Sequence, residues 1–390
     1  MIVVTNTLQT HQDRNFRYQQ LYDLMDQMSL QGLLLSGDGI IKFVNGEYAS
    51  GWGVYALIPR YGDPVLFQGS VERAYVLTPV YKNKKDYWIQ DIRLFYLPNV
   101  VEAFAEKKLL NAKIGFNYNN IPTGLFLALK DALKKVEIEI VEISNELKEI
   151  TIRKQGNYLK IIEEAVDIVD TCVQELPEIL HTGMYEYEVK AAVESIMTGR
   201  GADGTLILLN SDKNDISSPA IPTDHAPKAL SKGDYLVAEL TVNYRGCWVQ
   251  KIAIYSFGEP DEKVMDMFRV VNESIWQSIK MVKPGVNARD LINDIDDHIE
   301  ARGYLSPRKG YLSGPQGHLS GFDMDEWTFS PDKDFILDEG MLFVLHPGAA
   351  LKDWKAGKTA IFGPGTMFLV TKDGVRSLNR TTNEIYVIDK

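Results

Sequence analysis

Residues 317–326 read Gly-His-Leu-Ser-Gly-Phe-Asp-Met-Asp-Glu, with one imidazole, His318, between glycines. Two apolar runs flank this stretch in the chain. Residues 232–240 read Lys-Gly-Asp-Tyr-Leu-Val-Ala-Glu-Leu, and residues 339–348 read Glu-Gly-Met-Leu-Phe-Val-Leu-His-Pro-Gly. Both runs are typical of buried strands, and each ends near a polar side chain, Glu239 or His346. A buried polar group costs free energy unless it has a partner, so these side chains are candidates for a functional site.

These stretches, in this order, resemble the creatinase/prolidase/aminopeptidase P family, peptidase family M24. Residues 317–326 resemble that family's signature Gly-His-Gly-Ile-Gly-Leu-x-x-His-Glu, and Met367–Gly374 resembles its last strand and turn. The resemblance implies two domains and a mixed α/β and α+β architecture. We expect a creatinase-like N-terminal domain at residues 1–152 and a pita-bread domain of curved antiparallel sheet and helices at residues 153–390. The family also implies a homodimer.

The metal ligands of the family are exchanged in this chain. Its metal-dependent members hold two divalent ions with Asp, Asp, His, Glu and Glu around a bridging water. The matching positions here are Glu239, Gln250, His318, His346 and Gly365. Two divalent ions about 3.5–4 Å apart repel each other and need bridging carboxylates, and one carboxylate cannot replace four. We therefore expect no dinuclear site, no metal ligands and no other cofactor.

Creatinase and ectoine hydrolase are family members that work without a metal, and this chain resembles them in having lost the ligands. The leading hypothesis is a metal-independent hydrolase that cleaves a C–N bond in a small polar or cyclic substrate. His318 or His346 would be the general base that activates water, and Glu239 would orient it. The expected substrate-binding residues are Gln250, Glu326, Asp325 and His225, the last on a loop near the position of the creatinase base.

Two alternatives stay open at this point. The first is an Xaa-Pro aminopeptidase or dipeptidase with one metal ion at Glu239, His318 and His346, a His2Glu set of the kind found in catalytic zinc sites. The second is a non-catalytic pita-bread module that binds peptides or partner proteins. Metal content followed by a substrate screen separates the three hypotheses.

Composition excludes several other classes of protein. The chain has 390 residues, 45% of them hydrophobic and 24% charged, which is ordinary for a globular protein. The net charge of −11 argues against a nucleic-acid partner. We find no run of about 18 apolar residues and no secretory signal, so a membrane partner is not expected. Only Cys172 and Cys247 are present, which favours a reducing cytoplasm.

The first half of the chain alternates between helical and strand patterns, as an α/β domain does. We expect helices at residues 14–28 and 125–135, strands at 32–36, 113–116 and 136–141, a turn at 37–39 and a hairpin at 55–67. Near residue 153 the pattern changes to a long helix with one apolar stripe.

Overall fold

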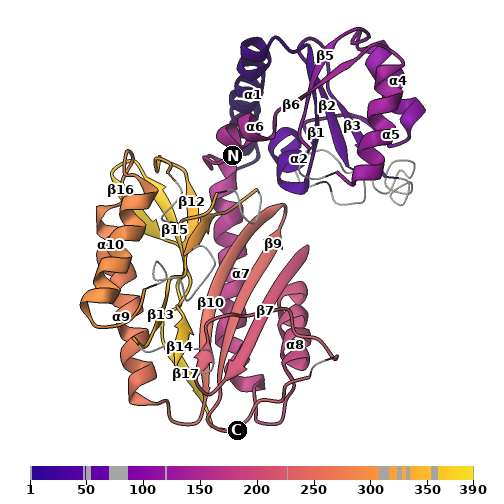
Figure 1. The fold of residues 1–390 in the computed structure, drawn as a ribbon. Helices are drawn as coiled ribbons and strands as arrows, with labels where there is room; N and C mark the ends of the chain where they lie inside the picture. Colours follow the sequence, from indigo (N-terminus) through magenta and orange to yellow (C-terminus); the bar gives the residue numbers. More distant parts are fainter. Residues whose placement is uncertain are drawn as a thin grey trace. The chain divides into compact units, whose positions relative to one another are not determined.

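The computed structural model describes residues 2–46, 49, 54–69, 87–118, 121–225, 227–306, 316–322, 327–330, 334–352 and 359–389, with the backbone alone for residues 2–11. The chain forms two compact units, Met1–Thr151 and Ile152–Lys390, and each is described by itself (Figure 1). Within the described residues, no helix has the length and apolar character that a membrane span requires.

The N-terminal unit is built on one six-stranded sheet with the order β4-β3-β2-β1-β5-β6. Its strands are β1 (Gly32–Ser36), β2 (Tyr55–Pro59), β3 (Val65–Gln68), β4 (Asp91–Leu94), β5 (Lys113–Phe116) and β6 (Glu139–Glu142). Its helices are α1 (Ile2–Met28), α2 (Asp38–Asn45), α4 (Leu97–Glu106), α5 (Thr123–Lys134) and α6 (Ser144–Thr151). The central strand β1 is buried along its whole length, which explains its continuous apolar sequence.

Two expected boundaries in this unit are wrong. Residues 38 and 39 begin helix α2 and do not form a turn, because Ile41 already donates its backbone N–H to Gly37. The strand expected from residue 136 starts at Glu139. Glu137 has φ 58°, a left-handed turn conformation, so the chain turns after α5 before it can extend.

The C-terminal unit contains three sheets, with orders β17-β10-β9-β7, β11-β12-β15-β16 and β13-β14-β8. The strands are β7 (Gly204–Asp212), β8 (Asp215–Ile216), β9 (Tyr235–Tyr244), β10 (Cys247–Phe257), β11 (Gly317–Leu319), β12 (Leu342–Leu345), β13 (Gly348–Ala350), β14 (Ala360–Phe362), β15 (Thr366–Thr371), β16 (Gly374–Ser377) and β17 (Ile385–Ile388). The helices are α7 (Asn157–Ile179), α8 (Glu186–Gly199), α9 (Glu262–Ser278), the short η3 (Ile279–Met281) and α10 (Ala288–Ala301).

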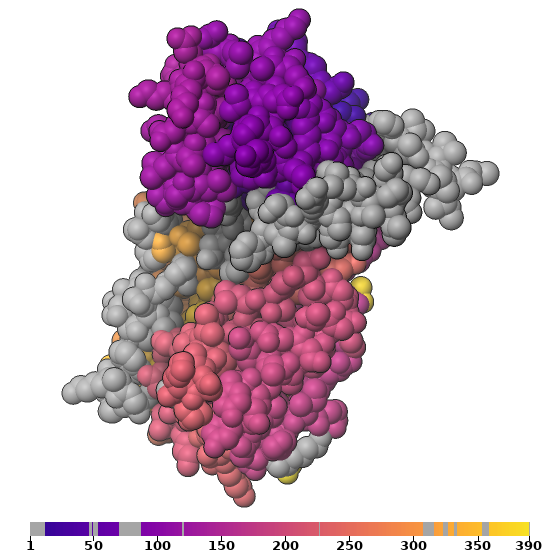
Figure 2. Space-filling model, turned by 90° about the vertical axis from the view of Figure 1, so that its right-hand side faces the viewer, coloured from indigo at the N-terminus to yellow at the C-terminus, as the bar shows by residue number. Residues whose placement is uncertain are grey.

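The helices of this unit cover the sheets in two pairs, α7 with α8 and α9 with α10 (Figure 1). On the face of the unit seen in Figure 2, the magenta-to-pink segment that includes α8 forms much of the outer surface. Helix α10 shows why such helices form here. Its apolar residues recur at helical spacing, and the Asn287 side chain caps its first turn by accepting the Arg289 N–H.

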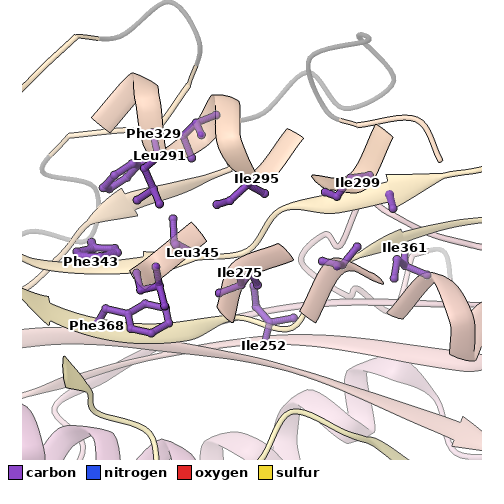
Figure 3. Close-up of a cluster of buried hydrophobic side chains, with 14 of the residues drawn as sticks. Ile252, Ile275, Leu291, Ile295, Ile299, Phe329, Phe343, Leu345, Ile361 and Phe368 are labelled. Atoms are coloured by element: carbon purple, nitrogen blue, oxygen red, sulfur yellow. The ribbon is translucent and has the colours of Figure 1, made fainter. Parts of the chain in front are cut away.

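The main core lies between α9, α10 and the strands beneath them. Leu291, Ile295 and Ile299 of α10 point toward the sheet that carries Phe343 and Phe368 (Figure 3). All five side chains are completely buried. Burying one such side chain contributes roughly 1.5–3 kcal/mol to the free energy of unfolding, so this cluster fixes the positions of β12 and β15 against α10.

Strands β9 and β10 form one long hairpin that carries part of the candidate site. Its two-residue turn, Arg245-Gly246, has φ 51° and 79°, which matches the twist of the two strands. Beyond the turn, Trp248 of β10 donates its N–H to the Gly321 carbonyl (2.6 Å) and accepts from the Ser320 hydroxyl (3.0 Å). These bonds fasten β10 to the chain that follows β11, and so bring Gln250 close to His318.

Candidate functional site

Three of the predicted residues form one hydrogen-bonded chain. Glu239 on β9 and Gln250 on β10 share a face of the hairpin, because Gln250 lies opposite Thr241, two residues from Glu239. Gln250 Nε2 donates to Glu239 Oε1 (2.5 Å), and His318 Nε2 lies 2.7 Å from Gln250 Oε1. Gln250 and His318 are 1% and 5% exposed, whereas Glu239 is half-buried, so the chain of polar groups runs from a half-buried carboxylate into the interior.

The chemistry of the three groups fixes the position of one proton. The amide N–H of Gln250 donates to the Glu239 carboxyl group, so the carbonyl oxygen of the same amide faces His318. That oxygen in turn needs a donor, so Nε2 of His318 carries a hydrogen. The other ring nitrogen of His318, Nδ1, lies 3.2 Å from the Leu319 carbonyl. The imidazole is therefore held in a set orientation.

His346 lies beside this chain at the end of β12. Its ring centroid is 5.5 Å from that of His318 and 4.9 Å from that of Phe362. Both of its ring nitrogens are buried, and neither has a hydrogen-bond partner among the described residues. Burial, together with the nearby His318, lowers the pKa of His346 to about 3. The imidazole is therefore neutral at pH 7 and keeps a lone pair on one nitrogen.

The fifth position, Gly365, has no room for a side chain. A Cβ atom added there would lie 2.9 Å from Cγ1, Cδ1 and the backbone nitrogen of Ile252. Ile252 and Gly365 are bridged across the sheets, so neither backbone can withdraw easily. The apolar side chain of Ile252 thus fills the space that a carboxylate at position 365 would need.

These residues do not fit two metal ions. One carboxylate remains, and the space of another is occupied by Ile252. In the part of the chain that the structure describes, no three His, Cys, Asp or Glu side chains form a ready group for a metal. By type, the donors of Glu239, His318 and His346 are a carboxylate and two imidazoles, a set that binds one divalent ion in other proteins, and the two imidazole rings lie side by side. Gln250 now lies between Glu239 and His318 and would have to move.

Of the other predicted residues, His225 does not join this group. The side chain of His225 is 93% exposed, and its nearest charged neighbour is Asp224 at 3.7 Å. Asp325 and Glu326 lie outside the described residues. The substrate-binding role expected of all three stays a prediction.

Two buried polar residues near the site escaped the sequence analysis. Gln316 immediately precedes β11, and its Nε2 donates to Asp296 Oδ2 of α10 (3.2 Å). They are 2% and 0% exposed. The sequence does contain one sign of this pair, because Asp296 is an acidic residue within the apolar stripe of α10, between Ile295 and Ile299.

Residues 160–377 match the model of metallopeptidase family M24. The chain is 25% identical over 376 residues to the Xaa-Pro dipeptidase of Pyrococcus horikoshii, covering 95% of this chain and 99% of that protein. It is 24% identical over 373 residues to the Xaa-Pro dipeptidase of Pyrococcus furiosus, with 95% and 99% covered. The structure of an Xaa-Pro dipeptidase from Bacillus anthracis is similar, with a TM-score of 0.79, 19% identity and 96% and 99% of the two chains covered.

These comparisons correct one hypothesis and confirm another. The hypothesis of a metal-independent, creatinase-like hydrolase is wrong, because the full-length relatives are Xaa-Pro dipeptidases and the matching family is one of metallopeptidases. The expected fold, an N-terminal domain followed by a pita-bread domain, is confirmed by the structural neighbours. The chain belongs to metallopeptidase family M24.

Proposed function

We propose that this protein cleaves the peptide bond before proline in Xaa-Pro dipeptides, with one divalent ion at Glu239, His318 and His346. Similarity to Xaa-Pro dipeptidases over 95% of the chain supports the substrate class. The observation that carries the proposal is the convergence of these side chains at the ligand positions of the family. A bound divalent ion supplies Lewis-acid polarisation of a carbonyl oxygen.

The protein's own side chains would bind and orient the dipeptide. Glu239 offers an anionic acceptor for the amino group, and the net charge of −11 favours a ligand with a cationic end. The Phe362 ring, next to His346, offers an apolar face for the proline ring. Once Gln250 moves aside, the ring nitrogen of His318 that it now contacts becomes available to the ion or to a proton of the substrate.

A second candidate function is dipeptide or peptide binding without turnover. One observation favours it specifically. Gln250 bonds to both Glu239 and His318, so two of the three candidate metal ligands already have a protein partner. Such a protein would bind the peptide in this pocket but would not cleave it.

Measurement of proline release separates the two functions. Protein treated with EDTA and then supplied with Mn²⁺, Co²⁺ or Zn²⁺ is incubated with Ala-Pro, and free proline is quantified, with Ala-Ala as the matched substrate control. We expect release of proline that depends on the added ion and little cleavage of Ala-Ala. A rise in Tm with Ala-Pro but no free proline would favour the binding module. Neither binding nor cleavage of Ala-Pro would contradict the proposed function.

A further inference from the structure

A second buried carboxylate and glutamine pair lies behind the candidate site. Asp296, on the inner side of α10, accepts a hydrogen bond from Gln316 Nε2 (3.2 Å). Because the N–H side of the Gln316 amide faces a carboxylate, its carbonyl oxygen Oε1 points elsewhere. That oxygen is buried, and no residue that the structure describes gives it a hydrogen bond.

Gln316 lies opposite His346, one step beyond the β11–β12 ladder. The His346 backbone N–H donates to the Gln316 carbonyl (2.9 Å), and the next pair in the ladder is Gly317 with Leu345. Residues paired in this way have Cβ atoms roughly 4.5–5.5 Å apart, within reach of a glutamine and a histidine. The two neighbours thus hold a buried acceptor, Gln316 Oε1, and two buried imidazole nitrogens, none of which has a hydrogen-bond partner in the part of the chain that the structure describes.

The other half of the site contains the same three kinds of side chain in the same order, and there both hydrogen bonds between them are present. There a carboxylate, Glu239, bonds to a glutamine, Gln250, which bonds to a histidine, His318. In the second set the carboxylate–glutamine bond is made and the glutamine–histidine bond is open. An imidazole carries at least one N–H in every protonation state, so it can always donate to an amide oxygen.

We propose that Gln316 is a positioning residue for His346. Its Oε1 accepts an N–H of the imidazole, directly or through one water, while Asp296 keeps the amide from turning over. This contact fixes which ring nitrogen of His346 keeps its lone pair for the site. The effect on catalysis rests on the proposed function, but the contact itself does not. Contacts of this kind typically change metal affinity or activity about 10–100-fold.

The test is the tautomer of His346, read from the ¹⁵N shifts of its ring nitrogens in protein labelled with ¹⁵N-histidine and free of metal. His346→Asn identifies the signal. We expect one fixed tautomer in the wild type and a mixture of tautomers in Gln316→Met, which keeps the length of the side chain but removes the acceptor. Gln277→Met, at an exposed position on α9, is the matched control and should leave the His346 signal unchanged.

A second variant keeps the proposal testable if Gln316→Met does not fold. Asp296→Asn lets the Gln316 amide turn over, because an asparagine can donate to Oε1, and His346 would then face an N–H group. We expect the proton to move to the other ring nitrogen or to be shared between both. An unchanged tautomer in both variants would overturn the proposal. A changed tautomer in a protein that releases no proline from Ala-Pro would support it and count against the proposed function alone.

Discussion

The two sides of the candidate site differ in their hydrogen bonds. On the side of β9, β10 and β11, Glu239, Gln250 and His318 form a continuous hydrogen-bonded chain. On the side of β12 and β15, His346 makes no side-chain hydrogen bond to a described residue, and Ile252 occupies the space beside Gly365. The strands themselves are apolar and well packed on both sides. The fold of this family therefore depends on its apolar pattern, whereas the chemistry depends on a few side chains that can change while the fold persists.

Substitution of His318 is the most direct test of the hydrogen-bonded side, the chain of Glu239, Gln250 and His318. We predict that His318→Ala lowers kcat/KM for Ala-Pro by about 10²–10⁴-fold, because the variant loses a proton-transfer group and a metal-ligand candidate together. Proline release and Tm are measured on the same samples. The Tm should fall only modestly, since the variant leaves Gln250 Oε1 without its present donor at a cost of about 1–3 kcal/mol.

His298→Ala is the matched control for this prediction. His298 lies on α10 with its side chain 44% exposed, and its Nδ1 is 2.7 Å from the Asp294 carbonyl. We expect nearly wild-type proline release from this variant. A folded His318→Ala protein with full activity would remove His318 from the mechanism.

The side that carries His346 is tested by measuring how the free energy of unfolding depends on pH. The pKa of His346 is about 3 in the folded protein and about 6.5 in the unfolded chain. Between these values the unfolded chain binds more protons, so the free energy of unfolding falls as the pH falls, and above about 6.5 this group contributes no slope. We predict that lowering the pH from 7.5 to 4.5 destabilises the wild type by about 2–3 kcal/mol more than His346→Asn.

Urea denaturation at both pH values measures this difference. The variant is its own control for the carboxylates, which titrate in the same range in both proteins. Equal losses of stability in the two proteins would mean that folded His346 is already protonated at pH 4.5. The difference in hydrogen bonding between the two sides of the site would then be smaller than the structure indicates.

A substitution at Gly365 tests whether Ile252 leaves room for a side chain at that position. We predict that Gly365→Ala lowers the free energy of unfolding by about 1–3 kcal/mol, because the added Cβ meets Ile252 at 2.9 Å. Gly204→Ala is the control, since its Cβ would meet only Asn243 Cβ at 3.8 Å, an ordinary contact. Urea denaturation of both variants gives the comparison. A Gly365→Ala protein as stable as Gly204→Ala would show that this space is open to a side chain.

The sequence predicted the strands better than the partners of the side chains. Apolar runs alone located β1, β5 and β12, because burial on both faces leaves a continuous apolar signal. Glu239, His318 and His346 were found because motif order survives when ligands change. Gln316 and Asp296 were missed because their contact joins a strand end to a helix, and no local pattern encodes such a pairing. The exposure of His225 likewise depends on the course of a loop, which periodicity does not report.

The central claim is that this site works with one divalent ion on an Xaa-Pro dipeptide. Its most direct test is proline release from Ala-Pro by EDTA-treated protein, titrated with the activating ion at protein concentrations well above the Kd. We predict no proline release without the ion, and a rate of release that rises linearly with added ion and levels off at one ion per chain. A break at two ions per chain would contradict the filling of the Gly365 position by Ile252. Release that is unaffected by EDTA, or absent at every ion concentration, would contradict the proposed function.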